Sequence, residues 1–133
     1  MPPLLGDLRI LVLEDELLIA MDVEQLCRDY GASEVTILRN LAEIDPENLA
    51  ARFDAAIVDL MLDGVSTLDF AKSLLDQNVP FVFASGYSDK AEIESDFPGV
   101  MLISKPYSGI DLVEAVAASC GRAVAQVFGA PIT

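Results

Sequence analysis

The sequence predicts an α/β fold in which a doubly wound, five-stranded parallel sheet is covered by helices on both sides. Short, dense aliphatic runs alternate five times with longer segments whose apolar residues recur at helical spacing. The runs are aliphatic on both faces, which is typical of parallel strands buried between two layers of helices. Because crossovers between parallel strands are right-handed, we expect a three-layer sandwich of (βα)5 type.

The first unit is a strand at residues 9–13 followed by a helix. Apolar residues then recur at helical spacing from Ile19 to Tyr30, and Gly31 is a natural C-terminal stop. The second unit begins with a strand at residues 34–38. These two units set the alternation that the rest of the chain repeats.

The next segment, residues 41–52, has a helical pattern interrupted by Pro46. This proline either opens a short helix capped by Asp45 or distorts a longer one, and the sequence leaves the choice open. The third strand follows at residues 55–58 and leads into an Asp63–Gly64 turn.

A third helix is predicted from Leu68 to Leu75, before a fourth strand at residues 79–84. The polar segment 89–96 has a weak helical pattern with little apolar surface. The last strand, at residues 100–103, precedes a final helix. One face of that helix is expected to carry these apolar residues: Ile110, Val113, Ala117, Cys120 and Val124.

Length and composition favour a single domain. The chain has 133 residues, of which 53% are hydrophobic, and this combination supports a buried core and argues against intrinsic disorder. The formal net charge of −14 argues against a phosphate-backbone binder and against docking on anionic membranes. We therefore expect neither nucleic acid nor membrane among the partners.

Histidine is absent, which excludes histidine-ligated metal, a histidine general base and a phosphohistidine on this chain. Cys27 and Cys120 have no metal-binding spacing and are interpreted as buried thiols in a reducing compartment. The N-terminus has no basic region before an apolar stretch, and no run approaches 18 apolar residues. These features favour a cytoplasmic protein.

Chemically active side chains follow four of the five predicted strands. Glu14 and Asp15 follow the first strand, Asp59 the third, Ser85 the fourth and Lys105 the fifth, whereas the second ends without such a group. In an open parallel sheet, ligands bind beyond the carboxyl ends of the strands. The sequence therefore predicts a site at that edge.

Three carboxylates at one edge repel each other, by roughly 3 kcal/mol per pair at about 5 Å and an effective dielectric constant of about 20. A cation would offset this repulsion, and an oxygen-only ligand set favours Mg²⁺. Lys105 would pair with a carboxylate or with phosphoryl oxygens, and Ser85 offers a hydroxyl donor. Asp59 is then placed as a nucleophile for phosphoryl transfer.

Each of these features alone has a structural interpretation. The acidic pair could cap a helix, Asp59 could belong to a turn, Lys105 to a solvated loop, and Ser85–Gly86 to another turn. Their joint placement at the carboxyl edge of one predicted sheet favours the functional interpretation.

At these residues the sequence resembles the receiver domain of two-component response regulators. The resemblance covers residues 8–120, which we take as the core, with a tail at 121–133. It implies a flavodoxin-like strand order of 2-1-3-4-5. It also implies that Asp59 is the phosphoacceptor and that Mg²⁺ binds Glu14, Asp15, Asp59 and the Met61 carbonyl.

The same resemblance implies that Ser85 contacts the phosphoryl group and moves with it, that Lys105 bridges to it, and that the bond before Pro106 is cis. Family members usually carry a switch aromatic where this chain has Leu102. Residues 80–87 are instead similar to the FAT GUY subgroup, which also lacks that aromatic and is associated with HWE-type histidine kinases. Tyr87 is then the candidate switch aromatic, and its alternative is a partly exposed loop tyrosine.

These features predict a stand-alone receiver that is not an enzyme. It would accept phosphate from a histidine kinase or a phosphotransfer protein and switch the 85–96 region. Its output is either a downstream protein target or transfer of the phosphate to another kinase. The apolar tail either extends the last helix on its own domain or forms a partner or homodimer surface. A fragment of a longer regulator is a further interpretation.

Three other function classes stay open. A Mg²⁺-dependent phosphatase or hydrolase would typically need an acid two residues after Asp59, where this chain has Met61. A flavodoxin-like cofactor binder would need a phosphate-binding loop after the first strand, and that loop is acidic here. A phosphorylation-independent interaction module would not need the acidic pair, Asp59 and Lys105.

Overall fold

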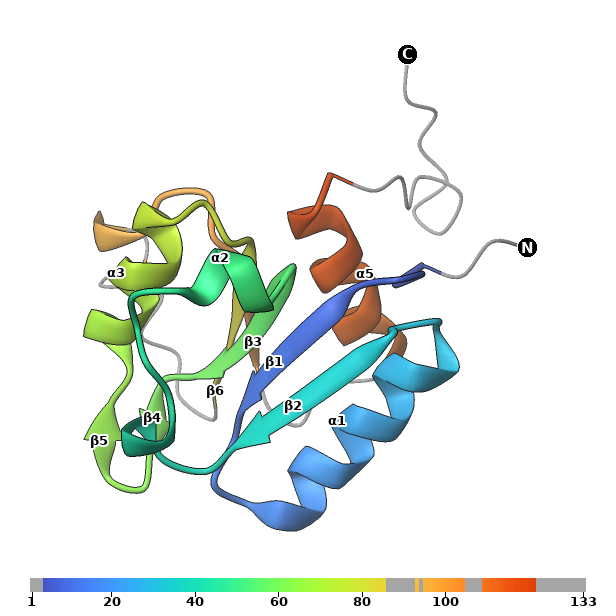
Figure 1. Cartoon of the computed structure of the whole chain (residues 1–133), viewed down its shortest axis with the longest axis horizontal. Helices are drawn as coiled ribbons and strands as arrows, with labels where there is room; N and C mark the ends of the chain where they lie inside the picture. Colours follow the sequence, from blue (N-terminus) through green and yellow to red (C-terminus); the bar gives the residue numbers. More distant parts are fainter. Residues whose placement is uncertain (1–3, 86–92, 94, 105–108, 122–133) are drawn as a thin grey trace.

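Five parallel strands form the central sheet of the protein (Figure 1). The computed structural model describes residues 4–85, 93, 95–104 and 109–121. The sheet has the order β2-β1-β3-β6-β7. Its strands are β1 (Arg9–Leu13), β2 (Glu34–Leu38), β3 (Ala55–Asp59), β6 (Phe81–Ser85) and β7 (Leu102–Ser104).

Two further strands, β4 (Met61–Leu62) and β5 (Val65–Ser66), form a separate antiparallel hairpin. Because this hairpin lies outside the main sheet, the five parallel strands taken in chain order run 2-1-3-4-5. The predicted fold class and strand order are thus confirmed. The hairpin itself was not predicted beyond its Asp63–Gly64 turn.

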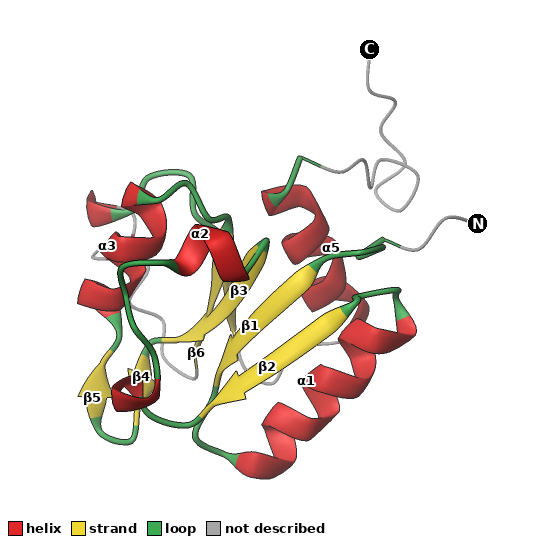
Figure 2. Ribbon diagram, viewed as in Figure 1, coloured by secondary structure: helices red, strands yellow, loops and turns green. Residues whose placement is uncertain are grey.

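Helices cover both faces of the sheet (Figure 2). α1 (Leu17–Asp29) and α5 (Gly109–Ser119) lie on one face, and α2 (Leu49–Arg52) and α3 (Leu68–Asp76) lie on the other. No helix in the described part of the chain combines the length and the apolarity that a membrane span requires.

Alternation along the strands divides the core into two halves, because successive side chains of a strand point to opposite faces. Ile10 and Val12 of β1 pack in the half beneath α1 and α5. Leu11 and Leu13 pack in the other half, beneath α2 and α3. All four side chains are buried, as expected for a strand between two helical layers.

Three phenylalanines stabilise the second half of the core. The ring centroids of Phe81 and Phe83 in β6 lie 5.3 Å apart, and both rings meet Phe97 edge-on, at 6.0 and 5.2 Å. Edge-to-face packing of this kind contributes beyond the apolar area that it buries. Phe97 thereby joins the segment before β7 to the centre of the sheet.

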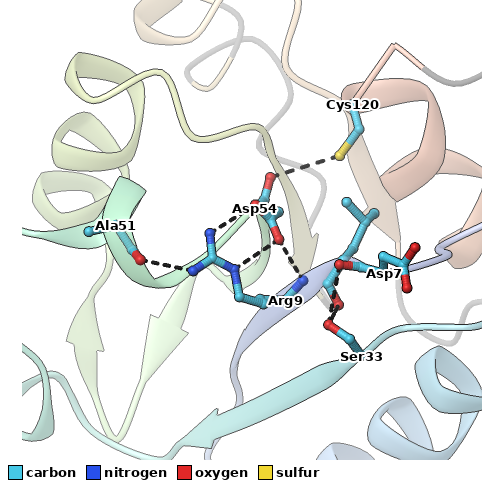
Figure 3. A network of polar contacts seen from close by, with 7 residues as sticks. Asp7, Arg9, Ser33, Ala51, Asp54 and Cys120 are labelled. Atoms are coloured by element: carbon cyan, nitrogen blue, oxygen red, sulfur yellow. Dashed lines mark hydrogen bonds and ion pairs between the residues drawn. The ribbon is translucent and has the colours of Figure 1, made fainter.

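An ion pair between Arg9 and Asp54 links the amino ends of the neighbouring strands β1 and β3 (Figure 3). The guanidinium of Arg9 contacts both carboxylate oxygens of Asp54 at 3.0 Å and donates to the carbonyl of Ala51 at 2.8 Å. The backbone amide of Arg9 also donates to Asp54, at 2.8 Å. This bidentate contact fixes the start of β1 against the start of β3.

Pro46 interrupts the predicted helix at residues 41–52. The segment forms a 3₁₀ turn at Leu41–Glu43 and only then the short α2, which begins at Leu49. Asp45 accepts a hydrogen bond from the Glu47 amide at 2.9 Å, so it organises a turn before the helix.

Two details at the end of the chain differ from prediction. Ile110 of α5 is 39% exposed, and its expected place in the core is taken by Leu112 and Val116. Cys120 is only partly buried, whereas Cys27 is buried as predicted. Most of the predicted helix at 89–96 and the tail beyond residue 121 lie outside the described residues.

Candidate functional site

Three carboxylates meet at the carboxyl edge of the sheet. Glu14 and Asp15 follow β1, and Asp59 ends β3, the strand beside it. One carboxylate oxygen from each residue lies within 4.8 Å of the other two. The parallel pairing of Leu13 with Val58 brings the two strand ends level and so produces this cluster.

Glu14 is the most buried member of the cluster, with 4% of its surface exposed. Its backbone amide donates to the Leu38 carbonyl at 3.1 Å, which extends the pairing with β2 by one residue. Its carboxylate accepts a hydrogen bond from the Glu16 amide at 3.2 Å. A charged group this deeply buried needs compensating partners, and a cation beside it would be one.

The β4–β5 hairpin contacts Asp15. Its two-residue turn, Asp63 and Gly64, has φ values of 52° and 77°, both in the left-handed region that a type I′ turn requires. This turn directs the Asp63 amide toward Asp15, whose Oδ2 atom accepts its hydrogen at 2.9 Å. The hairpin therefore holds one carboxylate of the cluster in place.

Asp59 is tied to the loop that follows it. Its Oδ1 atom accepts a hydrogen bond from the Met61 amide at 3.4 Å. Its backbone carbonyl accepts one from the hydroxyl of Thr67 at 2.6 Å, and the same hydroxyl lies 3.1 Å from the Leu60 carbonyl. Thr67 was not among the predicted site residues, because a threonine before a helix is ordinarily interpreted as a cap.

A cation also lies at this edge. Arg39 follows β2, and its Nη2 atom donates to the backbone carbonyl of Asp15 at 3.4 Å. The sequence interpretation assigned no functional group to the end of the second strand. The rule that identified the other residues, inspection of the position just after each strand, would have found Arg39 too.

The remaining predicted residues are only partly described. Ser85 ends β6 and pairs with Ser104 of β7, one residue beyond the pair formed by Asp59 and Ala84. The backbone of Ser85 therefore lies at the same edge as Asp59. The side chain of Ser85 lies outside the described part of the structure. The same is true of these three predicted residues: Tyr87, Lys105 and Pro106.

The donor atoms at this edge fit Mg²⁺ better than a softer metal. The cluster offers carboxylate oxygens from Glu14, Asp15 and Asp59, and the chain has no histidine. Both cysteines lie elsewhere, Cys27 on the buried face of α1 and Cys120 near Asp54 at the amino edge. Mg²⁺ selects such oxygen ligands and retains several waters, which suits a cluster open to solvent on one side.

Comparison with known proteins gives a consistent result. No family model matches the chain. The phyllosphere-induced regulator PhyR of Methylorubrum extorquens is 33% identical over 101 residues, which are 74% of this chain and 38% of that protein. The chain thus spans well under half the length of this curated relative.

Two solved structures extend the comparison. The response regulator receiver protein of Sinorhizobium medicae is 25% identical with a TM-score of 0.74, over 86% of this chain and 95% of that one. The response regulator PhyR of Brucella abortus is 27% identical with a TM-score of 0.68, over 86% of this chain and 47% of that one. Together with the strand order and the acidic edge, these likenesses identify the chain as a receiver domain of the response regulator family.

Proposed function

We propose that this receiver accepts a phosphoryl group on Asp59 from a phosphohistidine of a partner protein. The observation that carries the proposal is the approach of Glu14, Asp15 and Asp59 to within 4.8 Å at the carboxyl edge of the sheet. Like charges gathered this closely are unfavourable unless cations offset them. A divalent ion would offset this repulsion, and Asp59 could then accept an incoming phosphoryl group.

In this proposal Mg²⁺ is held by Glu14, Asp15, Asp59 and the Met61 carbonyl. When bound, the ion offsets negative charge on the carboxylate and on the phosphoryl oxygens. Arg39 adds a positive charge beside Asp15. The Asp63 amide keeps Asp15 oriented toward the cluster, at 2.9 Å from its Oδ2 atom.

The transfer is an in-line displacement at phosphorus. A carboxylate oxygen of Asp59 forms the new P–O bond while the P–N bond to the donor imidazole breaks. The imidazole nitrogen leaves with the electron pair and takes a proton from solvent. The product is an acyl phosphate on Asp59 and a neutral histidine on the donor.

Three further residues are assigned roles as part of the same proposal. Ser85 donates its hydroxyl to the phosphoryl group, and Lys105 pairs with the phosphoryl oxygens, its orientation set by a cis bond before Pro106. Tyr87 serves as the switch aromatic in place of Leu102, as in the FAT GUY subgroup. The new phosphate carries about two negative charges, enough to reorder residues 85–96.

The biological setting completes the proposal. The chain acts in the cytoplasm as a receiver domain over residues 1–133, and it is a phosphoacceptor, not an enzyme. Its donor is a histidine kinase, with the HWE type as first candidate, or a phosphotransfer protein. Its output is a protein target, a homodimer or a second kinase that takes the phosphate back.

Replacement of the acceptor tests the proposal. Wild-type protein incubated with a panel of autophosphorylated histidine kinases and Mg²⁺ should acquire radioactive phosphate, and Asp59→Asn should not. Asp69→Asn, an exposed carboxylate in the first turn of α3, is the matched control and should be labelled like the wild type. Label that persists on Asp59→Asn would assign the acceptor elsewhere, and steady hydrolysis of phosphomonoesters would favour the phosphatase alternative.

A further inference from the structure

We infer that Thr67 is a positioning residue for Asp59, fixing the backbone that carries both Asp59 and the Met61 carbonyl. Loss of its hydroxyl would weaken Mg²⁺ binding and slow phosphoryl transfer without removing any group that touches either. The inference rests on the proposed function of Asp59, and it adds a residue that the receiver chemistry described above does not use.

The contacts of Thr67 close the loop that leaves β3. Its side chain is fully buried, at 0% exposure. Its hydroxyl lies 2.6 Å from the Asp59 carbonyl and 3.1 Å from the Leu60 carbonyl, and its amide donates to the Leu60 carbonyl at 3.1 Å. Because a hydroxyl has one hydrogen, the shorter contact, to Asp59, is the principal one.

Helix capping does not account for this arrangement. Thr67 occupies the N-cap position of α3, where a threonine oxygen ordinarily accepts a hydrogen bond from an amide of the first turn. Its side chain makes no such bond here. The neighbouring Ser66 instead accepts from the Leu68 amide, at 3.3 Å. The hydroxyl of Thr67 is thus directed back toward the strand end that carries Asp59.

Among the described residues, two contacts hold Asp59 at both its backbone and its side chain. Thr67 binds its backbone carbonyl, and the Met61 amide binds its carboxylate at 3.4 Å. Rotation of the peptide between Asp59 and Leu60 would displace the carboxylate and the Met61 backbone together. Displacement of a reacting group by about 1 Å can cost up to about 100-fold in rate. Loss of a partner behind a metal ligand typically costs about 10- to 100-fold in affinity or activity.

The test compares three variants of the full chain. Thr67→Val keeps the shape of the side chain and removes the donor, whereas Thr67→Ser keeps the donor. Ser66→Ala is the matched control, because it removes the hydroxyl that accepts a hydrogen bond from the Leu68 amide at the N-terminus of α3. Each is measured by calorimetric titration with Mg²⁺ alone, by the rate of labelling with acetyl phosphate at saturating Mg²⁺, and by thermal unfolding.

We expect Thr67→Val to weaken Mg²⁺ binding and to slow labelling by about 10-fold each, the lower end of the range for such partners. Thr67→Ser should stay within about twofold of the wild type in both. Ser66→Ala should lower the thermal midpoint and leave both quantities unchanged. A purely structural role for Thr67 would make Thr67→Val behave like Ser66→Ala.

Wild-type affinity and rate in Thr67→Val would overturn the inference, as would equal losses in folded Thr67→Ser. If Thr67→Val does not fold, Thr67→Ala takes its place, because the smaller side chain leaves space for water to reach the two carbonyls. Its Mg²⁺ affinity and labelling rate are compared with the wild type in the same way. Calorimetry with Mg²⁺ requires no phosphoryl transfer, so it tests the role of Thr67 separately from the proposed function of Asp59. A wild type that binds Mg²⁺ but takes no label refutes the proposed function, while the affinity ratio still decides the role of Thr67. A wild type that does neither refutes both.

Discussion

Removal of one charge from the acidic cluster should stabilise the protein when no divalent ion is present. At a separation of 4.8 Å and an effective dielectric constant of about 20, each carboxylate pair costs roughly 3.5 kcal/mol. Asp15→Asn removes two of the three pairs, but Asp15 and Asp59 are partly exposed, so solvent screening reduces the total gain to about 2–3 kcal/mol. In this variant the Asp63 amide donates to a neutral amide oxygen and no longer to a carboxylate. The weaker hydrogen bond offsets about 1 kcal/mol of the gain.

The net stabilisation of about 1–2 kcal/mol corresponds to a rise of about 3–8 °C in thermal midpoint for a domain of this size. The assay is thermal unfolding followed by circular dichroism, first with a chelator and then with saturating Mg²⁺. Under the second condition the order reverses. The wild type gains about 2.7 kcal/mol at a Mg²⁺ concentration 100 times the Kd, and Asp15→Asn gains little.

Asp22→Asn is the matched control, since Asp22 is an exposed carboxylate of α1 and not a member of the cluster. It should unfold close to the wild type under both conditions. A lower midpoint for Asp15→Asn in chelator would refute the repulsion argument. A full response of that variant to Mg²⁺ would remove Asp15 from the metal site.

Two further predictions concern the core and the hairpin. Burial, and secondarily the charge of Glu24, raise the pKa of the Cys27 thiol to about 12 from 9.0, so the folded state favours the neutral thiol. Its contribution to stability should be complete below about pH 9 and should be lost as the pH rises from there toward 12. Iodoacetamide at pH 8 should accordingly modify Cys120 and spare Cys27 until urea unfolds the protein; native modification of Cys27 would contradict its burial. Gly64→Ala should cost about 1–2 kcal/mol in urea unfolding, because φ is +77° there while nothing lies within 4 Å of an added Cβ; an unchanged midpoint would mean that the turn relaxes freely.

The regular elements followed directly from residue patterns. The strands at residues 9–13 and 34–38 were predicted with the bounds that the structure has, because each aliphatic run is bounded by polar or charged residues. The sequence left the segment at 41–52 open because Pro46 competes with its apolar periodicity, and neither alternative gave the 3₁₀ turn followed by a helix from Leu49. The β4–β5 hairpin was missed because strands of two residues are too short to show any periodicity.

The site was predictable where side chains define it and not where the backbone does. The meeting of Glu14, Asp15 and Asp59 follows from one rule about the carboxyl ends of parallel strands. The Asp63 amide and the back-bonding hydroxyl of Thr67 depend on how one loop closes on itself. Neither contact leaves a signature in residue type, because many residues supply an amide and a threonine before a helix usually caps it.

The ion pair between Arg9 and Asp54 lies at the opposite edge of the sheet from the carboxylate cluster. The strand between them has five residues, or about 16 Å at about 3.3 Å per residue. That length is about twice the Debye length of about 8 Å at physiological salt, so the ion pair and the carboxylate cluster influence each other only weakly across the solvent. A fluorescent reporter attached at the exposed Ser33, beside this ion pair, should therefore leave the carboxylate cluster undisturbed.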